Sequence, residues 1–322
     1  MLPGWLTVIL WVATGAMGTL AILRFVAWDS LEMLVVINSV TLFVFVPAWP
    51  IVVVAGVGRR PWLAGAALLV VVAQLSFLAP EFAAAEPVPG WASAAPTIRV
   101  MDANVYEANS SMAGYEHQIQ EFHPDLLTME EASPADFLQL QHSGALHPLQ
   151  FRYEVRRYNS RAFLIASAFP LTNQRVVTVL GAPSIVEVTV NLPSGPRDVW
   201  VVHSNAPAPG TFGLWRAQLM EITDLLRARG VRGLLMLGDF NASWGNQRFR
   251  AILDTGMTDG AAARGRALDM TWSQTMRPLP PLVRIDHVLT GPGVAVTRIV
   301  TGVGQGSDHR DLMATVAFGH AG

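Results

Sequence analysis

The first 80 residues carry almost no charge, and this constrains the fold more than any other feature of the sequence. The charged side chains there are Arg24, Asp29, Glu32, Arg59 and Arg60. A helix rises about 1.5 Å per residue, so roughly 20 apolar residues cross the ~30 Å hydrocarbon core of a bilayer. The apolar stretches of about that length are Trp5–Ala27, Met33–Val57 and Trp62–Ala79. We therefore expect three transmembrane helices within residues 1–80.

The ends of these stretches predict how they cross the membrane. Tryptophans, whose rings favour the membrane interface, lie near the ends at Trp5, Trp28, Trp49 and Trp62. Pro47 and Pro50 predict that the second stretch kinks or ends early, because proline interrupts helical hydrogen bonding. Arg59 and Arg60 form a doubly basic loop, which the positive-inside rule assigns to the cytoplasm. We therefore expect a multi-pass protein of the cell membrane, in contact with the lipid bilayer and extracytoplasmic after the third span.

A change in composition marks the end of the apolar region. Residues 81–96 are rich in alanine and proline, which is typical of a linker. Nearly all charged side chains of the chain follow this segment. We therefore expect a membrane anchor over residues 1–80, a linker over 81–96 and a water-exposed domain over 97–322.

The charge balance limits the classes of function. The chain has 22 basic and 24 acidic residues, for a net charge of −2. A protein that holds duplex DNA by its phosphates usually has a basic face, and nothing in this balance requires one. The sequence contains no cysteine, which excludes disulfides and thiolate metal sites. There is no strong case for a nucleic-acid partner, and we predict no protein partner.

Residues 97–322 alternate short apolar runs with turn residues, a pattern typical of strands. The runs are Ile98–Ala103, Leu126–Met129, Phe163–Ala166, Ile185–Val190, Val199–Val202, Leu234–Leu237, Ile285–Leu289 and Leu312–Ala317. Ser133 followed by Pro134 predicts the start of a helix that ends near Gln141. Leu214–Arg229 has an amphipathic pattern that ends at Gly230. Many strands with few helices favour a mixed α/β or α+β sandwich.

Polar side chains gather where these runs end. The clusters are Asn104, Glu130 with Glu131, His203, Asp239 with Asn241, Asp286 with His287, and Ser307 with Asp308 and His309. Strand ends on one side of a sheet converge on a single pocket. Carboxylate and amide oxygens suit a hard cation such as Mg²⁺, which neutralises charge on a phosphoryl group. A nearby carboxylate or histidine could orient the attacking water. The pattern predicts a divalent-metal-dependent phosphoesterase.

Six segments resemble, in order, the motifs of the endonuclease/exonuclease/phosphatase superfamily. They are Ile98–Val105, Pro124–Glu131, Val201–His203, Gly238–Asn241, Ile285–Leu289 and Ser307–Arg310. The tetrapeptide Gly238-Asp239-Phe240-Asn241 is the most recognisable of them. The resemblance implies an α+β fold, a four-layer αββα sandwich, and hydrolysis of phosphoesters that depends on Mg²⁺ or Mn²⁺.

The resemblance also implies which residues bind the metal. Glu131 would ligate the ion with Asn104 beside it, and Asp308 would ligate it or orient His309. Glu130 stands where the superfamily often has glutamine, which leaves open which of the two glutamates is the ligand.

Catalytic roles follow from the same resemblance. Asp239 would orient or deprotonate the attacking water, and Asn241 would hydrogen-bond the phosphoryl oxygens as they gain charge. His309 would contact the scissile phosphate, while His203 and Asp286 would complete the phosphate pocket. Region 153–170 matches only loosely, and the tyrosine that many nuclease members use cannot be placed in it, which weakens a DNA-repair interpretation.

The membrane helices favour a lipid-linked phosphate or diphosphate as substrate, because the bilayer would deliver it to the domain. Three N-terminal spans followed by an external domain of this superfamily also resemble the VanJ-type teicoplanin-resistance proteins, which are polyprenyl-phosphate phosphohydrolases. An extracytoplasmic nuclease is the alternative, and a basic groove would favour it; the arginines to map are Arg152, Arg156, Arg157, Arg161, Arg248 and Arg250. A catalytically inactive, membrane-tethered binding module is a further alternative. The retained Asp239, Asn241, Asp308 and His309 argue against it.

Overall fold

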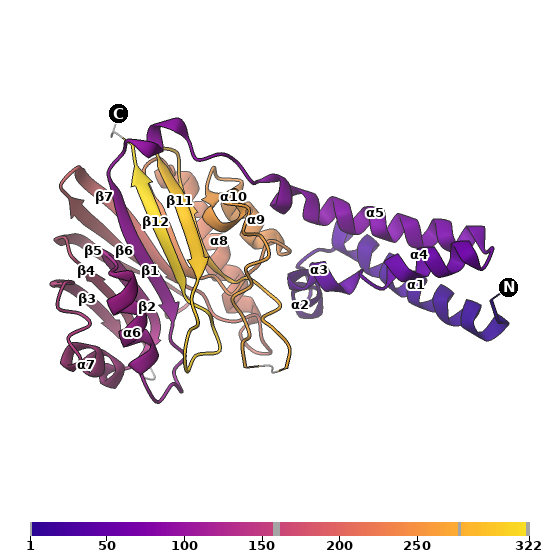
Figure 1. Ribbon diagram of the computed structural model, residues 1–322, viewed down its shortest axis with the longest axis horizontal. Helices are drawn as coiled ribbons and strands as arrows, with labels where there is room; N and C mark the ends of the chain where they lie inside the picture. The colour runs from indigo at the N-terminus through magenta and orange to yellow at the C-terminus, as the bar shows by residue number, and fades with distance from the viewer. Residues whose placement is uncertain (1, 157–161, 276–277, 320–322) are drawn as a thin grey trace. The chain divides into compact units, whose positions relative to one another are not determined.

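A computed structural model describes residues 2–156, 162–275 and 278–319 (Figure 1). The chain divides into two compact units. The first comprises Met1–Ala83 with Trp244–Gln247, and the second comprises Ala84–Ser243 with Arg248–Gly322.

Two helices of the first unit are long and apolar enough to cross a membrane. They are α1 (Gly4–Val26) and α5 (Pro61–Ala83), each of 23 residues. The second apolar stretch is divided into α2 (Glu32–Ser39), α3 (Thr41–Val44) and α4 (Ala48–Val57). The chain bends by 78° between Glu32–Ser39 and Thr41–Val57. This stretch is a third candidate span only if the two bent parts are taken together as one span. The described part of the chain therefore has two or three candidate spans.

The break in the second stretch has two parts. One lies before α4, where Pro47 occupies the N-cap position, as the prolines predict. The other lies at Val40, where the sequence has no proline. There the Thr41 hydroxyl donates to the Asn38 carbonyl oxygen at 2.6 Å, and Arg24 donates to the Asn38 and Thr41 side chains. These side-chain hydrogen bonds compete with the helical pattern and stabilise the bend.

The helices of the first unit pack together through small and apolar side chains. Ala21 of α1, Ile51 of α4 and Ala67 of α5 belong to one buried cluster. Large apolar side chains point outward as well; Trp62 is 85% exposed and Val26 is 75% exposed. Helices that are apolar on their outer faces suit a lipid environment, so candidate membrane helices here indicate contact with a bilayer.

The second unit contains two six-stranded sheets (Figure 1). The first sheet has the order β11 (Val294–Thr301), β12 (Leu312–Phe318), β1 (Thr97–Asn104), β2 (Leu126–Ala132), β4 (Ala162–Ser167) and β3 (Phe151–Arg156). The second has the order β5 (Leu171–Val179), β6 (Ala182–Leu192), β7 (Gly195–His203), β8 (Leu235–Asp239), β10 (Asp286–Thr290) and β9 (Thr258–Asp259). In each sheet one central pair is parallel, β1 with β2 and β7 with β8.

The two sheets pack face to face over an apolar core. Val100 of the first sheet and Val201 and Leu237 of the second belong to that core. Helices α6 (Ala113–Phe122) and α7 (Pro134–His142) cover the outer face of the first sheet through Tyr115 and Leu140. The other helices of the unit are η1 (Gly90–Ser93), α8 (Phe212–Arg229), α10 (Gly260–Ala263) and, from Arg248 onward, α9 (Gln247–Leu253). The α+β sandwich expected from the sequence is confirmed.

The predicted helices form because their end signals are satisfied. The Ser133 side chain accepts from the Asp136 amide, and the Asp136 side chain accepts from the Ser133 amide, which together form a capping box at the start of α7. Helix α8 ends at Gly230, whose φ of 78° is a conformation that glycine adopts readily.

Candidate active site

The strand register brings polar residues from both sheets to one edge of the sandwich. Asn104 ends β1 beside Glu130 of β2. On β8, Asp239 has His203 of β7 on one side and Asp286 of β10 on the other. Strand β10 runs antiparallel to β8, so its first residue, and not its last, lies at this edge.

Asp239 is the most firmly held of these residues. Its Oδ2 accepts from Asn104 Nδ2 at 3.0 Å and from Asn241 Nδ2 at 3.1 Å, and its Oδ1 accepts from the Asn241 amide at 2.7 Å. Burial, and next the charge of Asp286, raise the pKa of Asp239. Gly238 is required here because its φ is 131° and a Cβ would lie 2.0 Å from the Val202 carbonyl oxygen. The motif thus presents a carboxylate whose position is fixed.

The Asn241 side chain is already hydrogen-bonded within the protein, although its expected role is to donate to a phosphoryl oxygen. Its side-chain amide donates to the Ser204 carbonyl oxygen at 2.9 Å as well as to Asp239. Both amide hydrogens therefore have acceptors in this structure, and contact with a phosphoryl oxygen would require one of them to be exchanged.

His309 lies among three carboxylates. Its Nδ1 lies 3.0 and 3.1 Å from the two oxygens of Asp286, and its Nε2 lies 3.8 Å from both Asp239 Oδ2 and Asp308 Oδ1. Burial alone would lower the pKa of His309, but the charges of Asp286 and Asp239 outweigh it and raise the pKa to about 10. The imidazole is therefore positively charged at neutral pH when no metal is bound.

The segment that carries Asp308 and His309 is held by residues that the sequence motifs did not single out. Trp272 Nε1 donates to Asp308 Oδ2 at 2.9 Å. Gln274 Nε2 lies within hydrogen-bond distance of the carbonyl oxygens of Gly304, Ser307 and His309, among which it shares its two hydrogens. Neither Trp272 nor Gln274 lies at the end of a predicted strand, so nothing in the pattern pointed to them.

Ser307 connects this segment to β1. Its hydroxyl donates to the Asn104 carbonyl oxygen at 2.7 Å and accepts from the His309 amide at 2.9 Å. Ser307 thus holds the segment that carries Asp308 and His309 against the end of β1, where Asn104 lies.

A bulge separates the roles of the two adjacent glutamates. The register of β2 against β4 shifts between Glu130 and Ala132, and Glu131 has a φ of 59°. The bulge directs the Glu131 carboxylate toward His203, with Oε1 3.4 Å from Nε2 of His203. Its Oε2 accepts from the Glu107 amide at 3.1 Å.

Glu130 points between the sheets and is fully buried. Within the described residues, neither of its carboxylate oxygens has a hydrogen-bond donor. Its neighbour Asp102 is also buried and accepts from the Thr128 hydroxyl. Burial raises the pKa of Asp102 to about 8 and raises that of Glu130 as well, with the charge of Asp102 adding to the effect. These two acids therefore hold protons that exposed acids would lose.

This pair predicts a pH dependence of stability. A raised pKa in the folded chain means that the folded state binds protons more tightly, so stability is lost as pH rises toward the folded pKa of about 8. Each such group lowers the free energy of unfolding by at most about 1.4 kcal/mol per pH unit. We expect the thermal unfolding midpoint of the chelator-treated protein to decrease as the pH is raised from 5 to 8.

Glu130→Gln should flatten that decrease and raise the midpoint at pH 8. Glutamine cannot ionise, and its amide could donate to Asp102 Oδ2, which lacks a donor among the described residues. Activity should stay near that of the wild type, because glutamine has the shape of the protonated acid. Equal slopes for the two proteins would contradict the assignment.

The donor atoms at the site fit a divalent cation. Asp239, Asp286 and His309 are buried and each offers a ligand atom, and these atoms lie within 4.8 Å of one another. Carboxylate oxygens suit ions such as Mg²⁺ or Mn²⁺, whereas an imidazole nitrogen suits transition-metal ions. A cation would also offset the cost of burying adjacent carboxylates. The structure thus shows a possible metal site without indicating which ion it takes.

The expected ligands lie around this group and not within it. Asn104 contacts Asp239, Glu131 contacts His203, and Asp308 lies beside His309. Their role as ligands stays a prediction. His287, which follows Asp286, points elsewhere: it is buried against Asp259 at 2.9 Å.

The described residues do not test whether the arginines group as a nuclease would require. Arg152 donates to the carbonyl oxygens of Leu149 and Leu146. Arg157 and Arg161 lie outside the described residues.

The sequence pattern of the Endonuclease/Exonuclease/phosphatase family matches residues 103–309. No curated protein matches the chain.

Several solved structures share the fold. Truncated Caenorhabditis elegans TDP2 matches with a TM-score of 0.56 and 17% identity, over 69% of this chain and 97% of that chain. An endonuclease/exonuclease/phosphatase from Beutenbergia cavernae matches with a TM-score of 0.54 and 16% identity, over 69% and 72%. A 3'-5' exonuclease from Neisseria meningitidis matches with a TM-score of 0.50 and 18% identity, over 69% and 100%. At these identities the likeness shows the fold alone.

Proposed function

The chain belongs to the endonuclease/exonuclease/phosphatase family, and we propose that it is a divalent-metal-dependent phosphohydrolase acting on a phosphate or diphosphate carried by a membrane lipid. One observation carries the enzymatic part. Asp239, Asp286 and His309 form a buried group at the edge of the sandwich, and Asn104 and Asn241 hold Asp239 in place. Burying these polar groups lowers the stability of the fold. Such clusters of buried titratable groups are typical of catalytic sites.

The side chains suit hydrolysis of a phosphoester. His309, positively charged and aligned by Asp286, would hydrogen-bond a phosphoryl oxygen as it gains charge. Asp239 would orient the attacking water and accept its proton. A divalent cation would withdraw charge from the phosphoryl group; in our proposal Glu131, Asn104 and Asp308 would hold it beside the carboxylates of Asp239 and Asp286. Trp272 would position Asp308 through its hydrogen bond.

The candidate membrane helices support a lipid-linked substrate. Helices α1 and α5, and the bent pair between them, would hold the chain on a bilayer where such lipids reside. We propose that a polyprenyl phosphate or diphosphate at the outer face is the substrate class, with the loop at Arg59 and Arg60 cytoplasmic. A reporter fused after the last residue should then be active only outside the cytoplasm. Activity confined to the cytoplasm would contradict this topology.

Full-length protein in phosphatidylcholine nanodiscs tests the substrate. With Mg²⁺ present, farnesyl diphosphate, farnesyl phosphate, phosphatidic acid and DNA should be offered side by side, and released phosphate and cleaved DNA measured. We expect release from the isoprenyl compounds, and none from Asp239→Ala. The enzymatic proposal fails if no substrate is turned over faster by the wild type than by this variant.

Nuclease activity is the second candidate, and the DNA arm of the same assay tests it. The solved Neisseria meningitidis relative is a 3'-5' exonuclease, and Danio rerio TDP2 was solved with a single-strand DNA product. Cleavage of DNA without release of phosphate from the isoprenyl compounds would favour this candidate over the lipid-phosphate hydrolase.

A further inference from the structure

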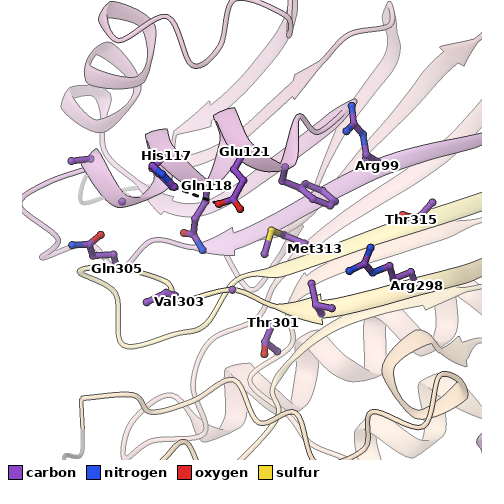
Figure 2. A pocket seen from close by; sticks show the side chains of 15 residues that line it. Arg99, His117, Gln118, Glu121, Arg298, Thr301, Val303, Gln305, Met313 and Thr315 are labelled. Carbon is purple, nitrogen blue, oxygen red and sulfur yellow. Dashed lines mark ion pairs between the residues drawn. The ribbon is translucent and has the colours of Figure 1, made fainter.

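A groove lies on the outer face of the first sheet, apart from the strand ends that carry Asp239. Helix α6 covers β1 and β2, and Ala92 of η1 packs against Ala295 and Ala317 at the far end of β11 and β12. Between these two covers, the outward side chains of β11 and β12 are only partly buried. The groove has a volume of about 960 Å³ and lies between α6 and the segment after β11 (Figure 2). We call it the side groove.

A row of three residues crosses one end of the side groove. Arg99 of β1 is paired with Thr315 of β12, and Thr315 is paired in turn with Arg298 of β11. Neighbouring strands lie about 4.8 Å apart, so the backbones of the two arginines are separated by roughly 10 Å. Figure 2 shows the Arg99 side chain directed away from Arg298 and Thr315. An anion above Thr315 would meet the hydroxyl and Arg298, and Arg99 would reach it by adopting another rotamer.

Among the described residues neither arginine side chain is paired, although the Asp125 carboxylate accepts from the Arg99 backbone amide at 2.7 Å. Both are exposed, and within the part of the chain that the structure describes neither guanidinium has an ion-pair or hydrogen-bond partner. Glu121 is the acidic residue among the described lining residues; it lies on α6, 3.7 Å from His117 Nδ1. Both positive charges are on the same face of the sheet with one strand between them, so a bound anion could interact with both. The planar guanidinium matches the oxygens of a phosphate group especially well.

The rest of the side groove is mixed: apolar side chains line it together with His117, Gln118, Glu121, Thr301 and Gln305. Met313 and Val300 extend from the strands and Phe122 from α6, and all three are partly buried. Val303, in the segment after β11, is 67% exposed. Contact between apolar side chains and water is unfavourable, and a hydrocarbon chain bound over these side chains would exclude that water. A positive end beside an apolar surface favours a ligand that has both a charged head and a hydrocarbon chain.

We propose that the side groove binds a phosphate-headed amphiphile. Its phosphate lies between Arg99 and Arg298 and accepts from Thr315, and its hydrocarbon chain lies over Met313 and Phe122. The inference does not depend on the proposed function, because none of these residues belongs to the group around Asp239.

Binding of hexyl phosphate to the full-length protein in phosphatidylcholine nanodiscs tests the proposal. Titration calorimetry in EDTA prevents metal-dependent turnover. We expect saturable binding that Arg99→Gln with Arg298→Gln weakens by about 10-fold or more, because two charge-assisted hydrogen bonds are lost. Inorganic phosphate should bind more weakly than hexyl phosphate, and hexyl glucoside should not compete. Binding of hexyl phosphate at any other site would persist in the double variant, so the comparison separates it from binding in the side groove.

Arg216→Gln is the matched control, because Arg216 is an exposed arginine on α8 and does not line the groove. It should bind as the wild type does. Arg298→Glu, a second variant, should abolish the binding while keeping the wild-type unfolding midpoint. Equal affinity of the wild type and the double variant would overturn the proposal. Equal affinity for inorganic phosphate and hexyl phosphate would overturn it as well, since the apolar surface would then contribute nothing.

Discussion

Asp239→Asn should reduce kcat/KM by about 10³-fold, the range expected when a positioned general base is removed. Asp239 is 1% exposed and accepts three hydrogen bonds from Asn104 and Asn241. Asparagine preserves the volume but removes the charge that faces His309 and any bound cation. The measurement is the steady-state rate with Mg²⁺ on a chromogenic phosphoester or on the isoprenyl substrate.

The unfolding midpoint of Asp239→Asn shows whether its loss of activity comes from chemistry or from unfolding. Burial raises the pKa of Asp239, so the folded chain gains when that charge is removed, and this gain offsets the hydrogen bond that the asparagine NH2 group cannot accept. The unfolding midpoint should therefore stay close to that of the wild type. Asp224→Asn is the matched control, because the Asp224 side chain is exposed on α8 and faces Arg227. Activity of Asp239→Asn within tenfold of the control would refute the assigned role.

Removal of divalent metal should abolish activity, and Mg²⁺ or Mn²⁺ should restore it. The three buried side chains Asp239, Asp286 and His309 offer ligand atoms close together, and a bound cation would compensate their charge. The folded state should also gain about 2.7 kcal/mol when metal is present at 100 times its dissociation constant. The checks are activity after dialysis against EDTA and the unfolding midpoint with and without added metal.

Substitutions separate the two sets of candidate ligands. Asp286→Asn tests the group that the structure brings together, and Glu131→Gln tests the residue implied by the family resemblance. We expect each to raise the Mg²⁺ concentration for half-maximal activity, whereas Asp224→Asn should leave it unchanged. Full activity of the dialysed wild type in the presence of EDTA would rule out metal dependence.

The strands that sequence patterns missed share a physical cause. All eight predicted runs fall on strands of the two sheets, but β3, β5, β9 and β11 were not expected. Strands β3 and β5 lie at the ends of their sheets and expose at least half of their side chains, so apolar alternation is weak. Strand β11 has a register shift between Val296 and Arg298, which interrupts the alternation. Strand β9 is two residues long.

The same limit applies to the membrane helices. Uniformly apolar stretches predicted α1 and α5 well, because length and hydropathy are local properties. The bend at Val40 depends on hydrogen bonds from Arg24 in another helix, and no local pattern encodes it.

The sequence by itself determined that the chain begins with apolar segments and that Asn104, Asp239 and His309 follow or flank apolar runs in the order of one family. Only the tertiary structure decided which atoms meet. Asn104 and Asp239 lie 135 positions apart and contact each other because two separate sheets end at one edge. The difference between Glu130 and Glu131 came from a bulge in β2, whose register depends on its pairing with β4. Local chemistry sets which residues end a strand, whereas contacts between strand ends arise from the pairing and packing of the whole sandwich.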